Sequence, residues 1–412
     1  MPSARRWLDA QKGAHVSPMK SPLVTVVTPS YNQGRFIRAT IESVLSQDYP
    51  NLEYIIMDGG STDETAAVVN DYASRLTWIS EKDRGQSHAI NKGFRMAKGE
   101  IVSWLNSDDY ILPGAVRHAV TALEKNPLAG AVYGEGYLIG EDGNITSRFP
   151  ATVPFNLWKL IYLSDYILQQ TSYFRKSVLD EVGYVDENLH WGMDWDLYVR
   201  IGKRYPIEYI PEYMGCLREY AAAKSFSGGG RRFRELAAIM RRHGGVRYPP
   251  GYVTYGLDTY GRIWTDWIER LTPSFLERPS KVFRHYFFCG TRYIIDKTLR
   301  EAQGCYTDGW AATKVHYMLP AGGKTLRIQG SLPNLGPSLQ GQRLDILCQG
   351  KQLASFNVPF GEFTFSVPAE SAAGMEFFSI VLRASKSIVP SRTGISPDPR
   401  RLAYMLKSIA WE

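Results

Sequence analysis

The stretch LVTVVTPSYNQGRFIRATIESVLSQDYPNLEYIIMDGG, residues 23–60, decides the fold. It begins with LVTVVT, a β-branched run typical of a buried strand. It then passes through the turn-prone PSYNQG into residues 35–46, whose apolar side chains recur at helical spacing. LEYIIM, residues 52–57, predicts a second strand. A strand, a helix and a strand with short connections indicate a parallel pair of strands covered by the helix.

The same alternation continues beyond residue 60. We predict helices over residues 65–73 and 86–97, strands at LTWIS and IVSWL, and a helix that Pro113 opens and that runs to Lys125. Two short strands, GAVYG and GYLIG, follow, and later helices are expected around residues 194–203 and over 231–242. The first half is therefore predicted to be α/β, with a doubly wound, mostly parallel sheet covered on both faces.

The last quarter of the chain has a different pattern. From about Thr307, short alternating runs are separated by Gly, Pro and Ser turns about every 8–12 residues, which is typical of a β-sandwich. We therefore predict four parts: a leader at 1–21, an α/β domain at 22–244, a helical basic-aromatic connector at 245–305 and an all-β sandwich at 306–412.

The charge of this 412-residue chain is unevenly placed. The formal net charge is +7, but residues 218–300 hold 16 Lys and Arg against 7 Asp and Glu, a net +9, so the remainder carries −2. A nucleic-acid binder would have to use that one segment, which contains no recognised binding motif, and we expect no nucleic-acid partner. The alternatives for the segment are peripheral contact with an anionic membrane face and a solvated bridge.

Sequence features also bear on location. No run of 18 apolar residues predicts a spanning helix, and the positive charges near the start precede no apolar core of a secretory signal. The four cysteines are widely spaced and are expected to be reduced thiols. We expect a cytoplasmic protein.

Polar residues follow four successive predicted strands. They are Pro29-Ser30-Tyr31, then Asp58, then Asp83, then Asn106-Ser107-Asp108-Asp109. Ligands of open α/β sheets bind beyond the carboxyl ends of the strands, and adjacent carboxylates there suit Mn²⁺ or Mg²⁺ carrying phosphate oxygens. Structural alternatives also exist: Asp108-Asp109, and Asp58 or Asp63, can cap helices, and Tyr31 can be a core ring. The recurrence at four strand ends favours a ligand site.

Two stretches, VTVVTPSYNQGRFIRATIESVLSQDYPNLEYIIMDGGSTDET and EKDRGQSHAINKGFRMAKGEIVSWLNSDD, resemble family 2 glycosyltransferases with the GT-A fold. The likeness runs from about Leu23 to Gly244. It implies a nucleotide-sugar donor, with Pro29, Tyr31 and Asp58 around the base and Asp83 and Lys92 lining the same pocket. It also implies that Asp108 lies near the ribose and that Asp109, with Asp108 beside it, holds the metal.

The segment HWGMDWDLYVR, residues 190–200, is a second chemical motif. On a helix Asp196 and Arg200 are four residues apart and can pair, which leaves Asp194 to act elsewhere. Asp194 is either a helix cap or, as the resemblance implies, the general base that deprotonates the acceptor hydroxyl. The resemblance implies a single displacement with inversion, while the metal stabilises the leaving diphosphate.

Two further groups of residues carry weaker signals, one for the donor and one for the acceptor. Lys224, in LREYAAAKSFSGG, matches an often basic segment that reaches the diphosphate in relatives; its alternative is a surface lysine. Gln170, His190 and Trp191 are candidates for the acceptor pocket, His190 and Trp191 having structural alternatives. The acceptor is expected to be a glycan or a lipid-linked glycan.

The final domain resembles a β-sandwich module found on bacterial glycosyltransferases. Its expected roles are glycan binding, oligomer formation or packing, and Tyr306, Trp310 and Tyr317 are candidates for sugar stacking unless they are buried. The sequence as a whole predicts an inverting glycosyltransferase of bacterial surface polysaccharide synthesis. The alternative is a non-catalytic protein that binds nucleotide sugars or glycans.

Overall fold

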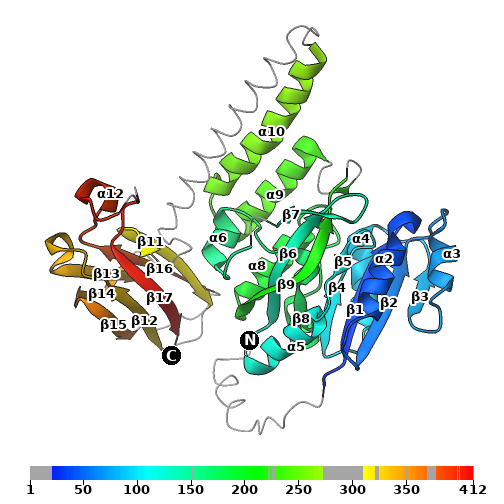
Figure 1. The fold of residues 1–412 in the computed structure, drawn as a ribbon, viewed down its shortest axis with the longest axis horizontal. Helices are drawn as coiled ribbons and strands as arrows, with labels where there is room; N and C mark the ends of the chain where they lie inside the picture. Colours follow the sequence, from blue (N-terminus) through cyan, green and yellow to red (C-terminus); the bar gives the residue numbers. More distant parts are fainter. Residues whose placement is uncertain are drawn as a thin grey trace. The chain divides into compact units, whose positions relative to one another are not determined.

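The structure is a computed structural model that describes residues 21–149, 152–220, 223–224, 228–271, 310–320, 324–348, 351–368, 377–396, 398 and 400–411. Most of the expected leader, the second half of the expected connector and Tyr306 lie outside these residues. The chain forms two compact units (Figure 1). The first comprises Met1–Phe155 and Asp165–Ile239, and the second comprises Asn156–Ser164 and Met240–Glu412.

The first unit is built on one sheet, which has nine strands within the described residues, in the order β3-β2-β1-β4-β8-β6-β9-β5, with β7 beside β6. The strands are β1 (Val24–Ser30), β2 (Leu52–Asp58), β3 (Thr77–Ser80), β4 (Ile101–Trp104), β5 (Tyr110–Ile111), β6 (Ala131–Ile139), β7 (Ile145–Arg148), β8 (Tyr173–Arg175) and β9 (Ile207–Arg218). The α/β class is confirmed. Strands β3-β2-β1-β4 are parallel, as are β6 and β9, whereas β5, β7 and β8 run antiparallel to their neighbours.

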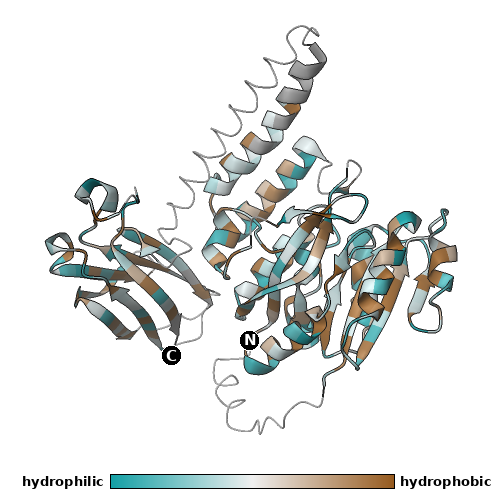
Figure 2. Ribbon diagram, in the orientation of Figure 1, coloured by the Kyte–Doolittle hydropathy of each residue, from teal (hydrophilic) through white to brown (hydrophobic). Residues whose placement is uncertain are grey.

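The helices of this unit are α2 (Gly34–Leu45), α3 (Thr65–Asn70), α4 (Gln86–Met96), α5 (Ala115–Lys125), α7 (Lys176–Val182), α8 (Met193–Gly202) and the start of α9 (Gly229–Gly244). Strand β1 is buried along its whole length, and α2 packs its apolar face, including Ile37 and Ile41, into the core beside it. Figure 2 shows β1 and β2 mostly in brown, the colour of hydrophobic residues. Helix α4 lies very close to β1, since a Cβ on Gly93 would come within 2.3 Å of Val27.

Two local predictions need correction. Pro113 does not open α5, because the chain first turns at Gly114, in the left-handed region with φ of 82°, and the helix begins at Ala115. GAVYG and GYLIG form the single strand β6, because pairing with the long strand β9 continues past register shifts on either side of Glu135.

The second unit contains two antiparallel sheets, each of four strands within the described residues. One has the order β10-β17-β12-β15 and the other β11-β16-β13-β14. Their bounds are β10 (Trp310–Ala311), β11 (Lys314–Pro320), β12 (Thr325–Leu332), β13 (Gln342–Cys348), β14 (Lys351–Val358), β15 (Gly361–Pro368), β16 (Phe377–Ala384) and β17 (Tyr404–Trp411). Side chains of both sheets share one core, against which Trp310 and Tyr317 are partly buried. The C-terminal antiparallel β region is thus confirmed, and these two rings contribute to its packing.

Two helices, α6 (Leu157–Tyr162) and α10 (Pro250–Leu271), also belong largely to the second unit. Helix α6 precedes β11 by about 150 residues, yet its Trp158 ring lies 5.7 Å from the His316 ring of β11. Among the described residues, no helix has both the length and the apolar character needed to cross a membrane.

Candidate active site

The carboxyl ends of β1, β2 and β3 lie side by side, because Ser30 is in register with Asp58 and Asp58 with Ser80. Asp58 is 2% exposed and accepts hydrogen bonds from the Ser61 N–H at 3.0 Å, the Ser80 hydroxyl at 2.5 Å and the Ser61 hydroxyl. Tyr31 directly follows β1 and is 62% exposed, so it is not a core ring. Of the predicted base-binding residues, Asp58 is therefore a buried carboxylate held by serine hydrogen bonds, and Tyr31 presents an exposed ring.

Pro29 lies in β1, and Asp63 lies in the loop that follows β2. Pro29 is a buried residue of β1 in register with Met57. Asp63 accepts the Gly34 N–H at 2.9 Å and the Thr65 N–H at 3.0 Å, so its carboxylate binds the first residues of α2 and α3. Asp63 therefore has the structural role of a helix cap.

Asp83 lies beside this aromatic face. Its carboxylate accepts the Gly85 N–H at 2.7 Å. A Cβ on Gly59 would lie 2.8 Å from Asp83 Oδ2 and 3.3 Å from the Tyr31 ring, so glycine at this position lets the two side chains approach each other. Lys92, on α4, is ion-paired with Glu81. Asp83 and Tyr31 are brought together as the sequence predicted, while Lys92 has an acidic partner of its own.

Asp109 is buried and held by protein donors. It is 1% exposed, and its carboxylate accepts hydrogen bonds from the Arg218 N–H at 2.8 Å, Gln170 Nε2 at 2.6 Å and Asn106 Nδ2 at 3.0 Å. Burial, together with the charge of Asp108, raises the pKa of the Asp109 carboxyl. Gln170 is itself 3% exposed, so it supports Asp109 rather than lining an open acceptor pocket as we expected.

Asp108 is the more accessible carboxyl of the pair. It is half-buried and accepts a hydrogen bond from the Tyr220 hydroxyl at 2.9 Å, and burial raises the pKa of its carboxyl. Neither aspartate caps α5, since strand β5 intervenes and the helix start has no side-chain cap. Within the described residues, no three acidic, His or Cys side chains gather as a metal cluster. A cation held by one carboxylate and by nucleotide phosphates nevertheless fits Asp108, because Mg²⁺ is commonly bound in that way.

Gln86, the first residue of α4, connects the two sides of the site. Its Nε2 donates to Asn106 Oδ1 at 2.6 Å, and its Oε1 accepts from Lys224 Nζ at 2.6 Å. Burial lowers the pKa of Lys224 to about 8, against the opposing charges of Asp194 and Glu235. Lys224 is thus a half-buried, hydrogen-bonded cation near Asp194 and not an exposed surface lysine.

Asp194 lies in the first turn of α8 and is half-buried. Burial raises the pKa of its carboxyl, while the Trp195 N–H, which donates to Oδ1 at 2.8 Å, and the cations Lys224 and Arg232 oppose that rise. The predicted ion pair on the same helix is present: Arg200 Nε lies 2.8 Å from the Asp196 carboxylate.

A second carboxyl lies near Asp194. Burial and the charge of Asp194 raise the pKa of Asp165 well above the ordinary aspartate value, and Asp165 accepts the Ile167 N–H at 3.1 Å. The sequence offered no signal for this pairing, because Asp165 stands in an irregular stretch without a motif.

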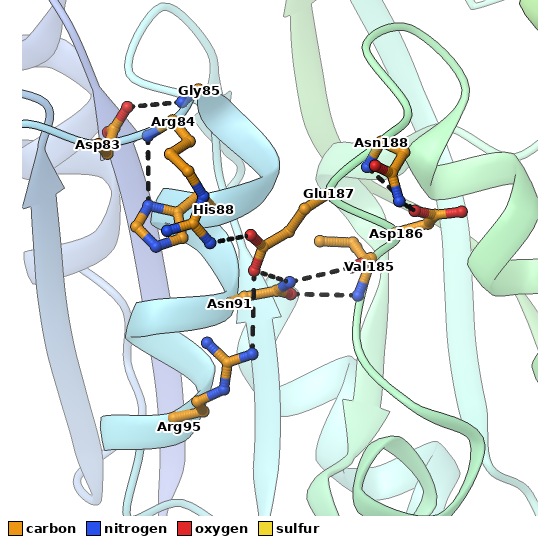
Figure 3. Close-up of polar contacts among 10 residues, drawn as sticks. All are labelled: Asp83, Arg84, Gly85, His88, Asn91, Arg95, Val185, Asp186, Glu187 and Asn188. Atoms are coloured by element: carbon orange, nitrogen blue, oxygen red, sulfur yellow. Dashed lines mark hydrogen bonds and ion pairs between the residues drawn. The ribbon is translucent and has the colours of Figure 1, made fainter.

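The segment that leads into α8 is attached to α4 (Figure 3). The Asn91 amide pairs with the Val185 backbone, donating to its carbonyl at 3.0 Å and accepting its N–H at 3.2 Å. Asn91 also donates to Glu187 at 3.0 Å, and Glu187 is ion-paired with Arg84 at 2.5 Å. Arg95 lies 3.8 Å from the same carboxylate. The donor-side motif and the motif that carries Asp194 are therefore joined by direct contacts.

The two remaining acceptor candidates lie at the end of that segment. His190 is exposed, Trp191 is half-buried, and their rings are 4.5 Å apart. Burial and the nearby Lys224 lower the pKa of His190. Trp191 is therefore not a core ring.

The α/β part of the chain is similar to known glycosyltransferases. Residues 25–182 match the sequence model described as "Glycosyl transferase family 2". An uncharacterized glycosyltransferase of Mycobacterium tuberculosis is 30% identical over 185 residues, which cover 44% of this chain and 69% of the relative. The chain belongs to glycosyltransferase family 2.

Other relatives of this family 2 chain are longer. The chondroitin synthase of Escherichia coli is 29% identical over 192 residues, 46% of this chain and 28% of the relative. The chain spans 65%, 33% and 58% of the length of three uncharacterized glycosyltransferases of Rickettsia species. Residues 1–349 of TarS from S. aureus, solved in complex with UDP-GlcNAc, align with a TM-score of 0.47 and 17% identity over 64% of this chain and 79% of that chain.

Two residues of the site were missed although the sequence carried a signal. Gln86 directly follows Asp-Arg-Gly in one of the two stretches that resemble the family. Glu235 is the single acidic residue of the arginine-rich helix α9. Neither residue type alone suggested a role, because each acts through contacts with distant segments.

Proposed function

We propose that this chain transfers a sugar from a nucleotide-sugar donor to a hydroxyl of a glycan or a lipid-linked acceptor, with inversion at the anomeric carbon. One observation carries the proposal. Lys224 is hydrogen-bonded to Gln86, which holds Asn106 of the donor-side loop, and the same ammonium interacts with Asp194. A carboxyl suited to act as a base and the donor-side loop therefore belong to one site.

The donor side would bind the nucleotide. The exposed Tyr31 ring is suited to stack on a base, with Pro29 before it in β1 and Asp83 as a hydrogen-bond acceptor. The buried Asp58 would hold the adjoining loops through Ser61 and Ser80. Lys92 belongs to the same side but has to exchange its partner Glu81 before it can reach a ligand. Uracil, guanine and thymine all offer N–H donors to such an acceptor, and the donor panel below distinguishes them.

A Mn²⁺ or Mg²⁺ ion would be held by Asp108, in place of the Asp109 that the resemblance suggested. Asp109 is 1% exposed and already accepts three hydrogen bonds, so it would orient the loop, while the half-buried Asp108 would face the ion. The bound ion would stabilise the negative charge that grows on the leaving diphosphate. Lys224 would add a second positive charge from the protein.

Asp194 would take the proton from the acceptor hydroxyl as that oxygen attacks the anomeric carbon. A raised pKa suits this role, because a more basic carboxylate is a better proton acceptor. Asp165 would not serve as the nucleophile of a double displacement. Its pKa is raised well above the ordinary value, which favours the neutral acid over the nucleophilic carboxylate.

We further propose a role in bacterial surface polysaccharide synthesis on the cytoplasmic side of the membrane. The name of the E. coli relative, chondroitin synthase, supports a polysaccharide product, since that protein shares 29% identity over 192 residues. The basic and aromatic residues of the connector, residues 245–305, would then contact the anionic leaflet where a lipid-linked acceptor lies. Binding to anionic vesicles that does not exceed binding to neutral vesicles would remove this membrane contact.

The central test uses Asp194→Asn and a panel of UDP-, GDP- and dTDP-sugars with Mn²⁺. We expect nucleoside diphosphate release to fall by about 10²–10⁴-fold, while Mn²⁺-dependent nucleotide binding stays near that of the unmodified protein. Asp71→Asn, which removes an exposed partner of Arg38, is the control. Full activity of Asp194→Asn would refute the assignment of the base. Binding of a donor without any turnover by the unmodified protein would favour the non-catalytic alternative.

A further inference from the structure

Three consecutive backbone N–H groups converge on one carboxylate just before α8. Glu235 Oε1 accepts the N–H of Trp191 at 2.6 Å and of Gly192 at 2.9 Å, and Oε2 accepts the N–H of His190 at 2.9 Å. Hydrogen bonds to an ionised acceptor are among the strongest in proteins. The carboxylate also lies at the N-terminal end of α8, where the helix dipole favours negative charge.

Close packing brings α9 onto the same residues. A Cβ on Gly192 would lie 2.6 Å from Ile239 and 2.9 Å from Leu236, both on α9. Gly228, with φ of 89°, lies directly under the Trp191 ring, where a Cβ would come within 2.3 Å. These two glycines permit a contact that larger residues would prevent. Glu235 therefore lies in a closely packed contact between α9 and the residues before α8.

The other end of the segment is fixed by α4. Asn91 pairs with the Val185 backbone, and the Ser87 hydroxyl donates to the Leu189 carbonyl at 3.1 Å (Figure 3 shows the Asn91 contacts). Residues 185–192 are therefore held from two sides, by α4 at their start and by α9 at their end. Asp194 follows this segment by two residues, so its position depends on both attachments.

We propose that Glu235 is a positioning residue for the reaction: by binding the three amides before α8, it sets where the helix begins and fixes the Asp194 carboxyl relative to Lys224. The proposal rests on the proposed function of Asp194 as the base. Glu235 also interacts electrostatically with Lys224, so one side chain acts on both Asp194 and Lys224. Glu235 itself need not contact donor or acceptor for this effect.

The kinetic test is Glu235→Gln, measured with the donor that the panel identifies. The amide keeps the size of the side chain, but it loses the charge and replaces one accepting oxygen with a donor. We expect kcat for diphosphate release to fall by about 10- to 100-fold, because small misplacement of a catalytic group has effects of that size. We expect KM for the donor to change by less than about threefold.

Glu53→Gln is the matched control. The Glu53 carboxylate also accepts a backbone N–H, from Lys98 at 2.8 Å, and a hydroxyl, from Thr25 at 2.6 Å, but it lies in β2 near the end remote from the site. This variant should match the unmodified protein in kcat. Equal losses of kcat in both variants would mean a general effect on stability and would overturn the proposal.

Hydrogen exchange tests the attachment without any assay of activity. In the unmodified protein the amides of residues 190–192 should exchange slowly, and in Glu235→Gln at least about 10-fold faster, with Glu53→Gln unchanged. Unchanged exchange in Glu235→Gln would overturn the proposal. If the unmodified protein turns over no donor, the proposed function fails. If it does turn over a donor and Glu235→Gln is equally fast, only the positioning role fails.

Discussion

Lys224 Nζ donates a hydrogen bond to Gln86 Oε1 at 2.6 Å, although the two residues are 138 positions apart. The same Gln86 side chain donates to Asn106. One amide therefore links the start of α4, the donor-side loop and the segment before α9.

The first prediction concerns this link. Gln86→Leu should weaken Mn²⁺-dependent nucleotide binding by about 10-fold or more, because a hydrogen bond to a charged group contributes about 1.5–3 kcal/mol. Titration calorimetry measures the effect. Gln47→Leu is the control, since Gln47 also makes several hydrogen bonds but lies just after α2, where it contacts Leu112 and Val116. Unchanged affinity in Gln86→Leu would show that the link does not affect the donor side.

The second prediction concerns pH above neutrality. Burial lowers the pKa of Lys224 to about 8, so the ammonium is charged below that pH and neutral above it. If the charge assists diphosphate binding, nucleotide affinity in the presence of Mg²⁺ should fall as pH rises from 7 to 9. Lys224→Arg should bind with little dependence on pH in this range, because arginine stays charged. An equal fall in both proteins would assign the dependence to another group.

The third prediction concerns the acidic side of the pH profile. A base acts only when deprotonated, so activity should be lost as pH falls through the pKa of Asp194, which is raised by burial. Asp165 and Asp194 repel each other when both are charged. The charge of Asp194 raises the pKa of Asp165, so Asp165 is still neutral while Asp194 titrates. Asp165→Asn should therefore leave the acidic limb of kcat in place. Asp71→Asn is the control, and a limb that moves to lower pH in Asp165→Asn alone would show that Asp165 is charged beside Asp194.

The fourth prediction separates the two adjacent aspartates. Asp108→Asn should abolish the dependence of nucleotide affinity on Mn²⁺. Asp109→Asn should instead lower the melting temperature, because an amide cannot accept all the hydrogen bonds that the buried carboxylate accepts. Titration calorimetry with and without EDTA, beside thermal unfolding, measures both effects. Metal dependence retained in Asp108→Asn and lost in a well-folded Asp109→Asn would return the metal to Asp109.

The fifth prediction concerns stability. Asp196 is 1% exposed and pairs with Arg200, which also donates to the carbonyls of Val182, Gly183 and Tyr184. Asp196→Ala should lower the free energy of unfolding by about 3–5 kcal/mol, because it leaves a mostly buried cation without its counter-ion. Asp180→Ala, at an exposed pair with Lys176, should change it by less than about 1 kcal/mol. Urea unfolding compares the two, and similar losses would contradict the distinction.

Local pattern was sufficient to predict much of the fold. Strands β1 and β2 and helix α2 begin and end within a residue or two of the predicted ranges, because burial periodicity and turn residues mark them along the chain. The break predicted between GAVYG and GYLIG was wrong for a non-local reason. The two runs read as separate short strands, but pairing with β9, some 80 residues later, keeps β6 extended.

The same limit applies to the site. Parallel strands bring their carboxyl ends to one edge, so Tyr31, Asp58 and Asp83 could be placed together from the sequence. The burial of Asp109 could not be predicted, because its partners Gln170 and Arg218 come from 61 and 109 residues away. Asp165 and Glu235 were missed for the same reason.

The position of α6 has a consequence for synthesis on the ribosome. Its residues 157–162 pack on β11, which is made about 150 residues later. At typical elongation rates that interval is ~8–30 s. During this time Leu157, Leu160 and Ile161, which are buried in the finished protein, lack that strand as a partner. The nascent chain therefore exposes the apolar side chains of α6, next to Asp165 in the sequence, until β11 has been made. A chain released from a ribosome stalled before β11 would keep these side chains exposed and would be prone to aggregate.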